Sequence, residues 1–229
     1  MEYLPGGYTL NISDGSFPLS TDSILLANFA SLRKSAKVLD LGSGCGTLGL
    51  LLCSMYPDCQ ITGIEIDPHS HEAALANIRD NEVCHRMQSI WGDLKQLNTH
   101  IDPGSFSCCI SNPPYFTAGP ASKAHTTARR EDHCTMEQLF HAASWAVKFG
   151  GDFYIVHRPE RLAELIHCAC TEKLEPKKIC LVRHKKDSPI SLVLVHCRKG
   201  AKPGLVWQEL YLYEQDGSPS DTYKKIYHL

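Results

Sequence analysis

The sequence has no run of about 18 consecutive apolar residues, the length that a membrane-spanning helix needs. Its first residues, MEYLPGGYTLNISDG, lack the basic and apolar stretches of a secretory signal. Internal repeats and low-complexity tracts are also missing. Since 43% of the 229 residues are apolar and 21% are charged, we expect a globular cytoplasmic protein with one sizeable core.

The eleven cysteines contain no C-x-x-C pair. The nearest approaches are Cys108-Cys109 and Cys168-Ala-Cys170, so neither a zinc site nor a redox motif is indicated. Most of the cysteines lie in apolar runs, where cysteine behaves as a small hydrophobic residue. We therefore expect reduced structural thiols and no metal site.

An overall excess of positive charge is missing as well, because the net charge is −2. That value argues against a generic nucleic-acid-binding protein. The charge is uneven, however: residues 1–150 sum to −5 and residues 151–229 to +3. From Lys173 to Lys202, nine basic residues stand against Glu175 and Asp187. Such a run can bind a polyanion, and it can equally be the solvated face of an exposed hairpin.

From residue 37 onwards, short apolar runs alternate with helical segments. The expected strands are 37–42, 60–66, 88–91, 106–111 and 152–157, and the expected helices are 47–55, 68–80, 137–149 and 161–170. This alternation predicts an α/β, Rossmann-like fold with helices on both faces of a mostly parallel, seven-stranded sheet. Residues 178–184 and 189–198 indicate an antiparallel C-terminal hairpin. Residues 205–213 could form one more extended segment.

The chain is expected to divide into three parts. Residues 1–36 lead into the core, residues 37–200 form it, and residues 201–229 are an extension packed on it. Ser220 is expected to cap a short last helix. The connection 117–134 is long for a compact domain, which indicates a functional loop.

A glycine-rich turn, Asp40-Leu-Gly42-Ser-Gly44-Cys-Gly46, follows the first expected strand and opens the first expected helix. Glycines permit a tight turn and a close approach of a ligand to the backbone. The dinucleotide fingerprint G-x-G-x-x-G does not fit, because its last position falls on Thr47. An acidic residue inside the motif suits a cationic ligand better than a pyrophosphate.

Two more carboxylates end the next expected strands. Glu65 can accept hydrogen bonds from both hydroxyls of a ribose, and Asp93 can accept one from an adenine amine. Together with Asp40, they fit a nucleoside that carries a positive centre and no phosphate. On these residues the chain resembles the class I methyltransferases that depend on S-adenosyl-L-methionine, over about residues 20–170. The resemblance implies that this cofactor, which leaves as S-adenosyl-L-homocysteine, contacts Thr21, Asp40, Gly42, Ser43, Gly44, Gly46, Glu65, Ile66, Asp93, Leu94 and Asn112.

The tetrad Asn112-Pro113-Pro114-Tyr115 follows the fourth expected strand, at the edge where open parallel sheets bind ligands. The prolines fix the backbone, so that the Pro113 carbonyl and the Asn112 side-chain oxygen can both act as acceptors. Tyr115, with Phe116 beside it, offers a flat ring for a planar group. Two acceptors can hold the hydrogens of an exocyclic amine and aim its lone pair at an electrophilic methyl group. The tetrad therefore predicts N-methylation, with these four residues as the catalytic set.

The tetrad resembles that of amino-methyltransferases acting on adenine, on guanine or on a protein glutamine. Residues 17–29, 128–131, 156–162 and 174–179, with the tail from Leu210, further resemble one bacterial family, the tRNA1(Val) (adenine(37)-N6)-methyltransferases. The resemblance implies methylation of adenine N6 in tRNA, next to the anticodon, with no membrane partner; a monomer is preferred. Besides Phe116, the residues expected to contact the RNA are Lys123, Arg129, Arg130, His157 and Arg158.

Three alternatives stay open. A protein-glutamine N5-methyltransferase of the release-factor type shares the tetrad, although such enzymes carry a helical domain in front and only about 36 residues precede the first strand here. An rRNA guanine-N2 methyltransferase is the second alternative. The third is a non-catalytic RNA-binding scaffold, against which the intact Asp40, Glu65 and tetrad argue.

Overall fold

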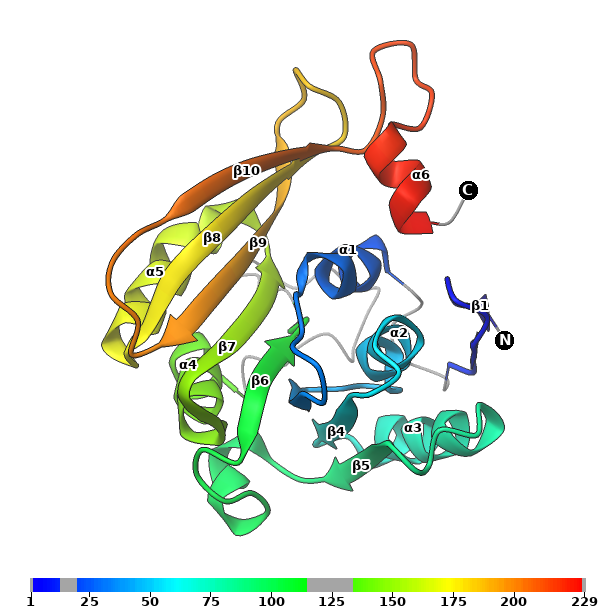
Figure 1. Ribbon diagram of the computed structural model, residues 1–229, viewed down its shortest axis with the longest axis vertical. Coiled ribbons are helices and arrows are strands. Elements are labelled where there is room, and N and C mark those ends of the chain that lie inside the picture. Colours follow the sequence, from blue (N-terminus) through cyan, green and yellow to red (C-terminus); the bar gives the residue numbers. More distant parts are fainter. Residues whose placement is uncertain (1, 13–19, 115–133, 228–229) are drawn as a thin grey trace, which may run out of the picture.

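The computed structural model describes residues 2–12, 20–114 and 134–227. An eight-stranded sheet with the order β10-β8-β9-β7-β6-β3-β4-β5 forms its centre (Figure 1). Its strands are β3 (Lys37–Leu41), β4 (Gln60–Glu65), β5 (Met87–Trp91), β6 (Phe106–Ser111), β7 (Val147–His157), β8 (Leu174–Arg183), β9 (Ile190–Lys199) and β10 (Val206–Tyr211). Strands β3 to β7 pair in parallel, and β9 is antiparallel to both β7 and β8. The predicted α/β fold with an antiparallel C-terminal hairpin is confirmed.

The predicted number of seven strands is wrong by one. After the hairpin, the chain crosses back and adds β10 in parallel to the edge strand β8, with Val206 opposite Lys178 and Tyr211 opposite Arg183. An extended segment at 205–213 was expected, but its pairing depends on contacts with β8 that are remote in the sequence.

Helices cover both faces of the sheet. They are α1 (Thr21–Phe29), α2 (Thr47–Met55), α3 (Pro68–Asp80), α4 (Met136–Ala146), α5 (Leu162–Thr171) and α6 (Asp221–Tyr227), with the short helices η1 (Leu94–Thr99) and η2 (Pro159–Arg161). Figure 1 shows α1 and α2 on one side of the sheet and α4 and α5 on the other. Strand side chains alternate between two cores: Cys108 and Ile110 join the first, and Cys109 joins the second. Among the described helices, none is long and apolar enough to cross a membrane.

The helix boundaries that were predicted most accurately are those marked by a proline or a capping residue. Helices 47–55 and 68–80 are confirmed at both ends. Pro68 occupies the first turn of α3, and the Asp67 carboxylate caps that helix by accepting from the Ser70 N–H at 2.9 Å. Ser220 caps α6 as expected, because its hydroxyl accepts from the Tyr223 N–H.

The predicted end of the helix 137–149 is wrong. Helix α4 ends at Ala146, and Val147 already pairs with Phe106 as the first residue of β7. Gly150, with φ +73°, lies inside β7 beside a register irregularity instead of terminating a helix. A β-branched residue at 147 and a strand partner at 106 outweigh the glycine stop signal.

A two-stranded hairpin, β1 (Glu2–Tyr3) and β2 (Thr9–Leu10), precedes the core. Asn77 of α3 connects Asn11, the residue after β2, to Cys45 in the glycine-rich turn. Its side chain accepts from the Asn11 N–H at 2.8 Å and donates to the carbonyls of Asn11 and Cys45, both at 2.9 Å. Because Asn77 is fully buried, these bonds replace water that its amide would otherwise need.

We expect Asn77→Ala to lower the free energy of unfolding by about 2–4 kcal/mol, since it leaves backbone groups of the half-buried Asn11 and of the buried Cys45 without these partners. Urea denaturation of the wild type and the variant measures the loss. The exposed Asn98→Ala serves as the control and should change stability by less than about 0.5 kcal/mol. Equal effects of the two substitutions would show that the Asn77 amide contributes no net stability.

Candidate active site

The carboxyl ends of the parallel strands meet at one edge of the sheet, where three predicted segments come together. The glycine-rich turn follows β3, Glu65 ends β4, and the Asn112 segment follows β6. The Ser111 hydroxyl donates to the Leu41 carbonyl at 2.7 Å, which fixes the end of β6 beside the end of β3. The topology therefore gathers these candidates at the place where open sheets bind ligands.

The glycine-rich turn is folded tightly against β4. The N–H groups of Gly42 and Ser43 both donate to the Ile64 carbonyl, at 3.0 and 3.1 Å. Gly42, Gly44 and Gly46 have φ values of +74°, +55° and +86°, which L side chains rarely adopt. A Cβ at Gly42 or Gly44 would meet no atom within 4 Å. The turn therefore needs glycine for its conformation, and the space above it is open to a ligand.

Asp40 is a buried carboxyl group in β3, directly before this turn. It is 1% exposed, and neither oxygen has a hydrogen-bond partner among the described residues. Burial, with the Glu65 carboxylate nearby, raises the pKa of Asp40 to about 8. The Ser43 hydroxyl is likewise buried without a described partner. Such orphaned groups fit a ligand with a positive charge and hydrogen-bond donors.

Glu65 fixes the other side of the turn. One carboxylate oxygen accepts from the Gly44 N–H and the other from the Asp67 N–H, each at 2.8 Å. Because a carboxylate has about four acceptor positions, two bonds leave room for hydroxyl donors. The next residue, Ile66, accepts through its carbonyl from the indole N–H of Trp91, whose side chain is 61% exposed at the end of β5.

Asp93 follows β5 two residues after Trp91, and its carboxylate contacts residues of the next short helix, η1. It caps η1 by accepting from the Lys95 N–H at 2.9 Å, and it forms an ion pair with the Lys95 ammonium at 3.5 Å. Leu94 is the first residue of η1 and is half-buried. Binding of an adenine amine by Asp93 stays a prediction and would have to share the carboxylate with this cap.

Asn112 is held from two directions. Its backbone leads into Pro113, which is buried, and its side-chain nitrogen Nδ2 donates to the Ser23 hydroxyl at 2.9 Å and, more weakly, to Ser20 at 3.5 Å. The nitrogen end of the amide is thereby occupied. Its oxygen Oδ1 has no donor among the described residues and can accept from a ligand. The predicted Pro114 is half-buried next in the chain.

Helix α1 supplies this support, which the sequence reasoning missed. Ser20 and Ser23 lie 92 and 89 residues from Asn112, so no local pattern links them. The segment Ser-Thr-Asp-Ser does carry a helix-capping signal, and the structure confirms the cap at Ser20. Thr21, predicted to approach the cofactor, is the first residue of α1, and its side chain is exposed.

The predicted RNA contacts have mixed outcomes. His157 is fully buried, its Nδ1 accepts from the Arg158 N–H at 2.8 Å, and burial together with Arg161 lowers its pKa to about 4. A neutral buried ring is not a phosphate ligand, so that part of the prediction is wrong. Arg158 is exposed at the carboxyl edge and remains a candidate. Five further predicted residues lie outside the described part of the chain: Tyr115, Phe116, Lys123, Arg129 and Arg130.

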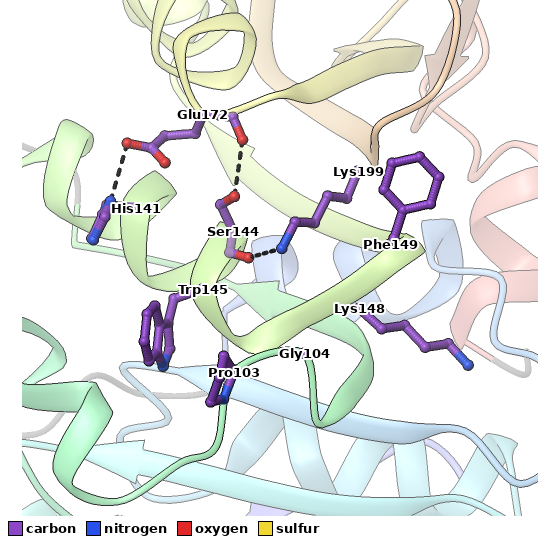
Figure 2. A pocket seen from close by; sticks show the side chains of 9 residues that line it. All are labelled: Pro103, Gly104, His141, Ser144, Trp145, Lys148, Phe149, Glu172 and Lys199. Carbon is purple, nitrogen blue, oxygen red and sulfur yellow. Dashed lines mark hydrogen bonds and ion pairs between the residues drawn. The ribbon is translucent and has the colours of Figure 1, made fainter.

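A cavity of about 410 Å³ lies elsewhere, at the amino edge of the sheet (Figure 2). Three of its polar side chains, those of His141, Ser144 and Lys199, bond within the fold. His141 contacts Glu172 at 3.2 Å, the Ser144 hydroxyl donates to the Glu172 carbonyl, and Lys199 donates to the Ser144 carbonyl. Among the described residues, no group of histidine, cysteine or acidic side chains could hold a metal ion, and all eleven cysteines are free.

Comparisons with known proteins agree with this geometry. The family description "Methyltransferase small domain" matches residues 19–166. A protein from Actinobacillus pleuropneumoniae serotype 5b named tRNA1(Val) (adenine(37)-N6)-methyltransferase is 28% identical over 91% of this chain and 87% of its own length. A relative of the same name from Porphyromonas gingivalis (strain ATCC 33277) is 30% identical over 75% of this chain and 72% of its own length.

Solved structures share the fold. A predicted O-methyltransferase from Agrobacterium tumefaciens has a TM-score of 0.77 and 19% identity, and the match covers 91% of this chain and 96% of that one. Geranyl diphosphate C-methyltransferase from Streptomyces coelicolor A3(2) has a TM-score of 0.58 and 12% identity, covering 77% and 78% of the two chains. At these identities the likeness concerns the fold alone.

Proposed function

The chain belongs to the methyltransferase small domain family and to the family of its relatives named tRNA1(Val) (adenine(37)-N6)-methyltransferase, and from that premise we propose that it methylates adenine N6 in tRNA. It is an S-adenosylmethionine-dependent methyltransferase. The observation that carries the proposed acceptor is the half-buried amide of Asn112, fixed at the carboxyl edge by Ser23 with its oxygen left for an amine. A tRNA substrate also supports a cytoplasmic location.

The residues at the edge fit S-adenosylmethionine. Asp40 offers a buried carboxyl without a described partner, and Glu65 keeps acceptor positions for hydroxyls. The turn leaves space for a ligand above Gly42 and Gly44. We assign Asp40 and the turn to the methionine part of the cofactor, and Glu65 with Ile66 to its ribose. When bound, the cofactor supplies an electrophilic methyl group on a positively charged sulfur.

The chain's own contribution to the reaction is orientation. Asn112 Oδ1 and the Pro113 carbonyl accept hydrogen bonds from the two hydrogens of the adenine amine, which favours a pyramidal nitrogen and turns its lone pair towards the methyl group. These acceptors also stabilise the positive charge that develops on the amine. No strong base is needed, because the methylated ammonium loses its proton readily.

Burial of Asp40 predicts that cofactor binding releases a proton. With a pKa of about 8, the carboxyl is mostly protonated at pH 7, and a cation bound beside it lowers that pKa. We expect the wild type to release roughly half to one proton per cofactor at pH 7, and nearly none at pH 9, where Asp40 is already ionised. Calorimetry in buffers of different ionisation enthalpy measures the number, with Asp40→Asn as the control. Release that is unchanged in Asp40→Asn would assign the proton to another group.

Most of the basic side chains between Lys173 and Lys202 contact other groups of the same chain. Six of its nine cationic side chains contact groups of the same chain: Lys177 (the Lys202 carbonyl), Lys178 (the Phe29 ring), Arg183 (the Ser188 carbonyl), Lys185 (the Gln215 carbonyl), Arg198 (Asp152) and Lys199 (the Ser144 carbonyl). Lys185 and Lys186 follow β8, which runs parallel to β7, so they lie at the carboxyl edge. We propose that RNA phosphates contact this end of the run, together with Arg158.

Neutralising Lys185 and Lys186 to glutamine is therefore expected to weaken tRNA binding and to reduce the slope of log affinity against log salt by about 1–2, because fewer counterions are released. Filter binding at several salt concentrations measures the slope. The matched control changes Lys177 and Lys178, which lie nearer the start of β8, and should leave the slope unchanged. A larger effect of the control pair would move the RNA contact away from the carboxyl edge.

The class of substrate is tested by offering radiolabelled S-adenosylmethionine with undermethylated bulk tRNA or with a peptide release factor. We expect label in the tRNA and none in the protein. Label in the release factor alone would replace the proposal by protein-glutamine methylation, which uses the same arrangement of acceptors.

A further inference from the structure

We propose that Ser23 is a positioning residue that sets the orientation of the Asn112 amide for methyl transfer. The inference rests on the proposed role of Asn112 as an acceptor for the target amine. It adds a residue of α1, remote in the sequence from the tetrad, whose hydroxyl decides which end of that amide faces the substrate.

The contact joins two rigid supports. Ser23 is 6% exposed in the first turn of α1, and its neighbours Ile24 and Leu25 are buried in the core. The Ser20 hydroxyl caps this turn by accepting from the Ser23 N–H at 3.3 Å. On the other side, Pro113 restricts the backbone after Asn112. The distance of 2.9 Å between Asn112 Nδ2 and Ser23 Oγ is therefore held by both elements.

The hydroxyls of Ser20 and Ser23 are within hydrogen-bond distance of each other, and either of them can be the donor. They lie 3.4 Å apart, and Ser20 already accepts at its oxygen from a backbone N–H. If the Ser23 hydroxyl donates its hydrogen to Ser20, its own oxygen is left to accept from Asn112 Nδ2. The chain of donors then runs from Asn112 to Ser23 to Ser20, and Asn112 Oδ1 is turned to the opposite side.

The two orientations of the amide differ in their effect on the reaction. With Oδ1 towards the substrate, Asn112 accepts from the target amine. With Nδ2 towards the substrate, two donors face each other and the amine is repelled. Without the Ser23 hydroxyl, Nδ2 loses its main partner and both orientations become populated. Ser23 thus acts through Asn112 as a positioning residue.

Steady-state kinetics of Ser23→Ala and Ser23→Thr test the proposal. Loss of one hydrogen bond predicts a kcat about tenfold lower in Ser23→Ala, with the KM for S-adenosylmethionine unchanged. Ser23→Thr keeps the hydroxyl and should restore kcat to within about threefold of the wild type. Ser54→Ala is the matched control. Among the described residues, the hydroxyl that it removes bonds only to the Leu51 carbonyl within α2 and to the Pro5 carbonyl. A kcat unchanged in Ser23→Ala, or a rise in the KM for the cofactor alone, would overturn the proposal.

A second readout needs no substrate. The side-chain NH2 signals of Asn112, assigned by their loss in Asn112→Ala, should exchange slowly with solvent in the wild type and faster in Ser23→Ala. Equal exchange in both would overturn the positioning role. If the wild type methylated no tRNA, the proposed function would fail, whereas the exchange rates would still decide whether Ser23 holds the amide.

Discussion

Asn112→Ala is expected to lower kcat for tRNA methylation by roughly 10³-fold while leaving the affinity for S-adenosylmethionine close to that of the wild type. The amide oxygen is the side-chain acceptor that the structure turns away from Ser23, and its removal leaves the target amine neither oriented nor stabilised as charge develops. Turnover is measured by methyl transfer to tRNA, and cofactor affinity by calorimetry.

The exposed Asn28→Ala on α1 is the matched control for this substitution, and it should leave kcat unchanged. A loss of cofactor affinity that accounts for the whole loss of turnover in Asn112→Ala would contradict the assignment. Asn112 would then belong to the cofactor site and not to the acceptor site.

Glu65→Ala is expected to weaken cofactor binding by about 1–3 kcal/mol, because hydrogen bonds to a charged acceptor are lost. The same carboxylate also holds the Gly44 N–H of the glycine-rich turn and the Asp67 N–H at the start of α3. Its removal therefore affects both the predicted ribose contact and the shape of the turn. Calorimetry gives the affinity of the wild type and the variant.

Glu65→Gln is an intermediate change, because glutamine keeps one acceptor oxygen where glutamate has two. That oxygen has to serve the two backbone N–H groups and the ribose. We expect an affinity between those of the wild type and Glu65→Ala. Glu72→Ala, at an exposed position of α3, is the control and should bind the cofactor normally. An affinity unchanged in both Glu65 variants would remove Glu65 from the cofactor site.

The fold was predictable where local signals and core packing agree. The start of α3 is determined by its own local residues, Asp67 as the cap and Pro68 in the first turn. The run 106–111 forms a mostly buried strand, as its apolar composition predicts. The prediction failed at Gly150, where pairing between β7 and β6 outweighs a helix stop signal. The parallel pairing of β10 with β8 was also missed, because the sequence of an extended segment does not indicate which strand of the sheet it will pair with.

The candidate site divides in the same way. Asp40, Glu65 and Asn112 could be predicted because each follows or ends a strand and carries its own chemistry. Ser23 could not, since a serine in a helix cap gives no sign of a partner 89 residues away. His157 was placed correctly at the end of β7, but its side chain points into the fold, where burial keeps it neutral. Position along a strand is readable from the sequence; burial at its end depends on tertiary packing.

The most direct test of the central claim identifies the methylated atom. Unmodified tRNA1(Val) is incubated with the enzyme and S-adenosylmethionine carrying an isotopically labelled methyl group. One part of the RNA is digested to nucleosides and another part to oligonucleotides, and both are measured by mass spectrometry. We expect labelled N6-methyladenosine among the nucleosides, and we expect the oligonucleotide fragments to place it at adenine 37. Label in N2-methylguanosine, or none in the RNA, would contradict the claim.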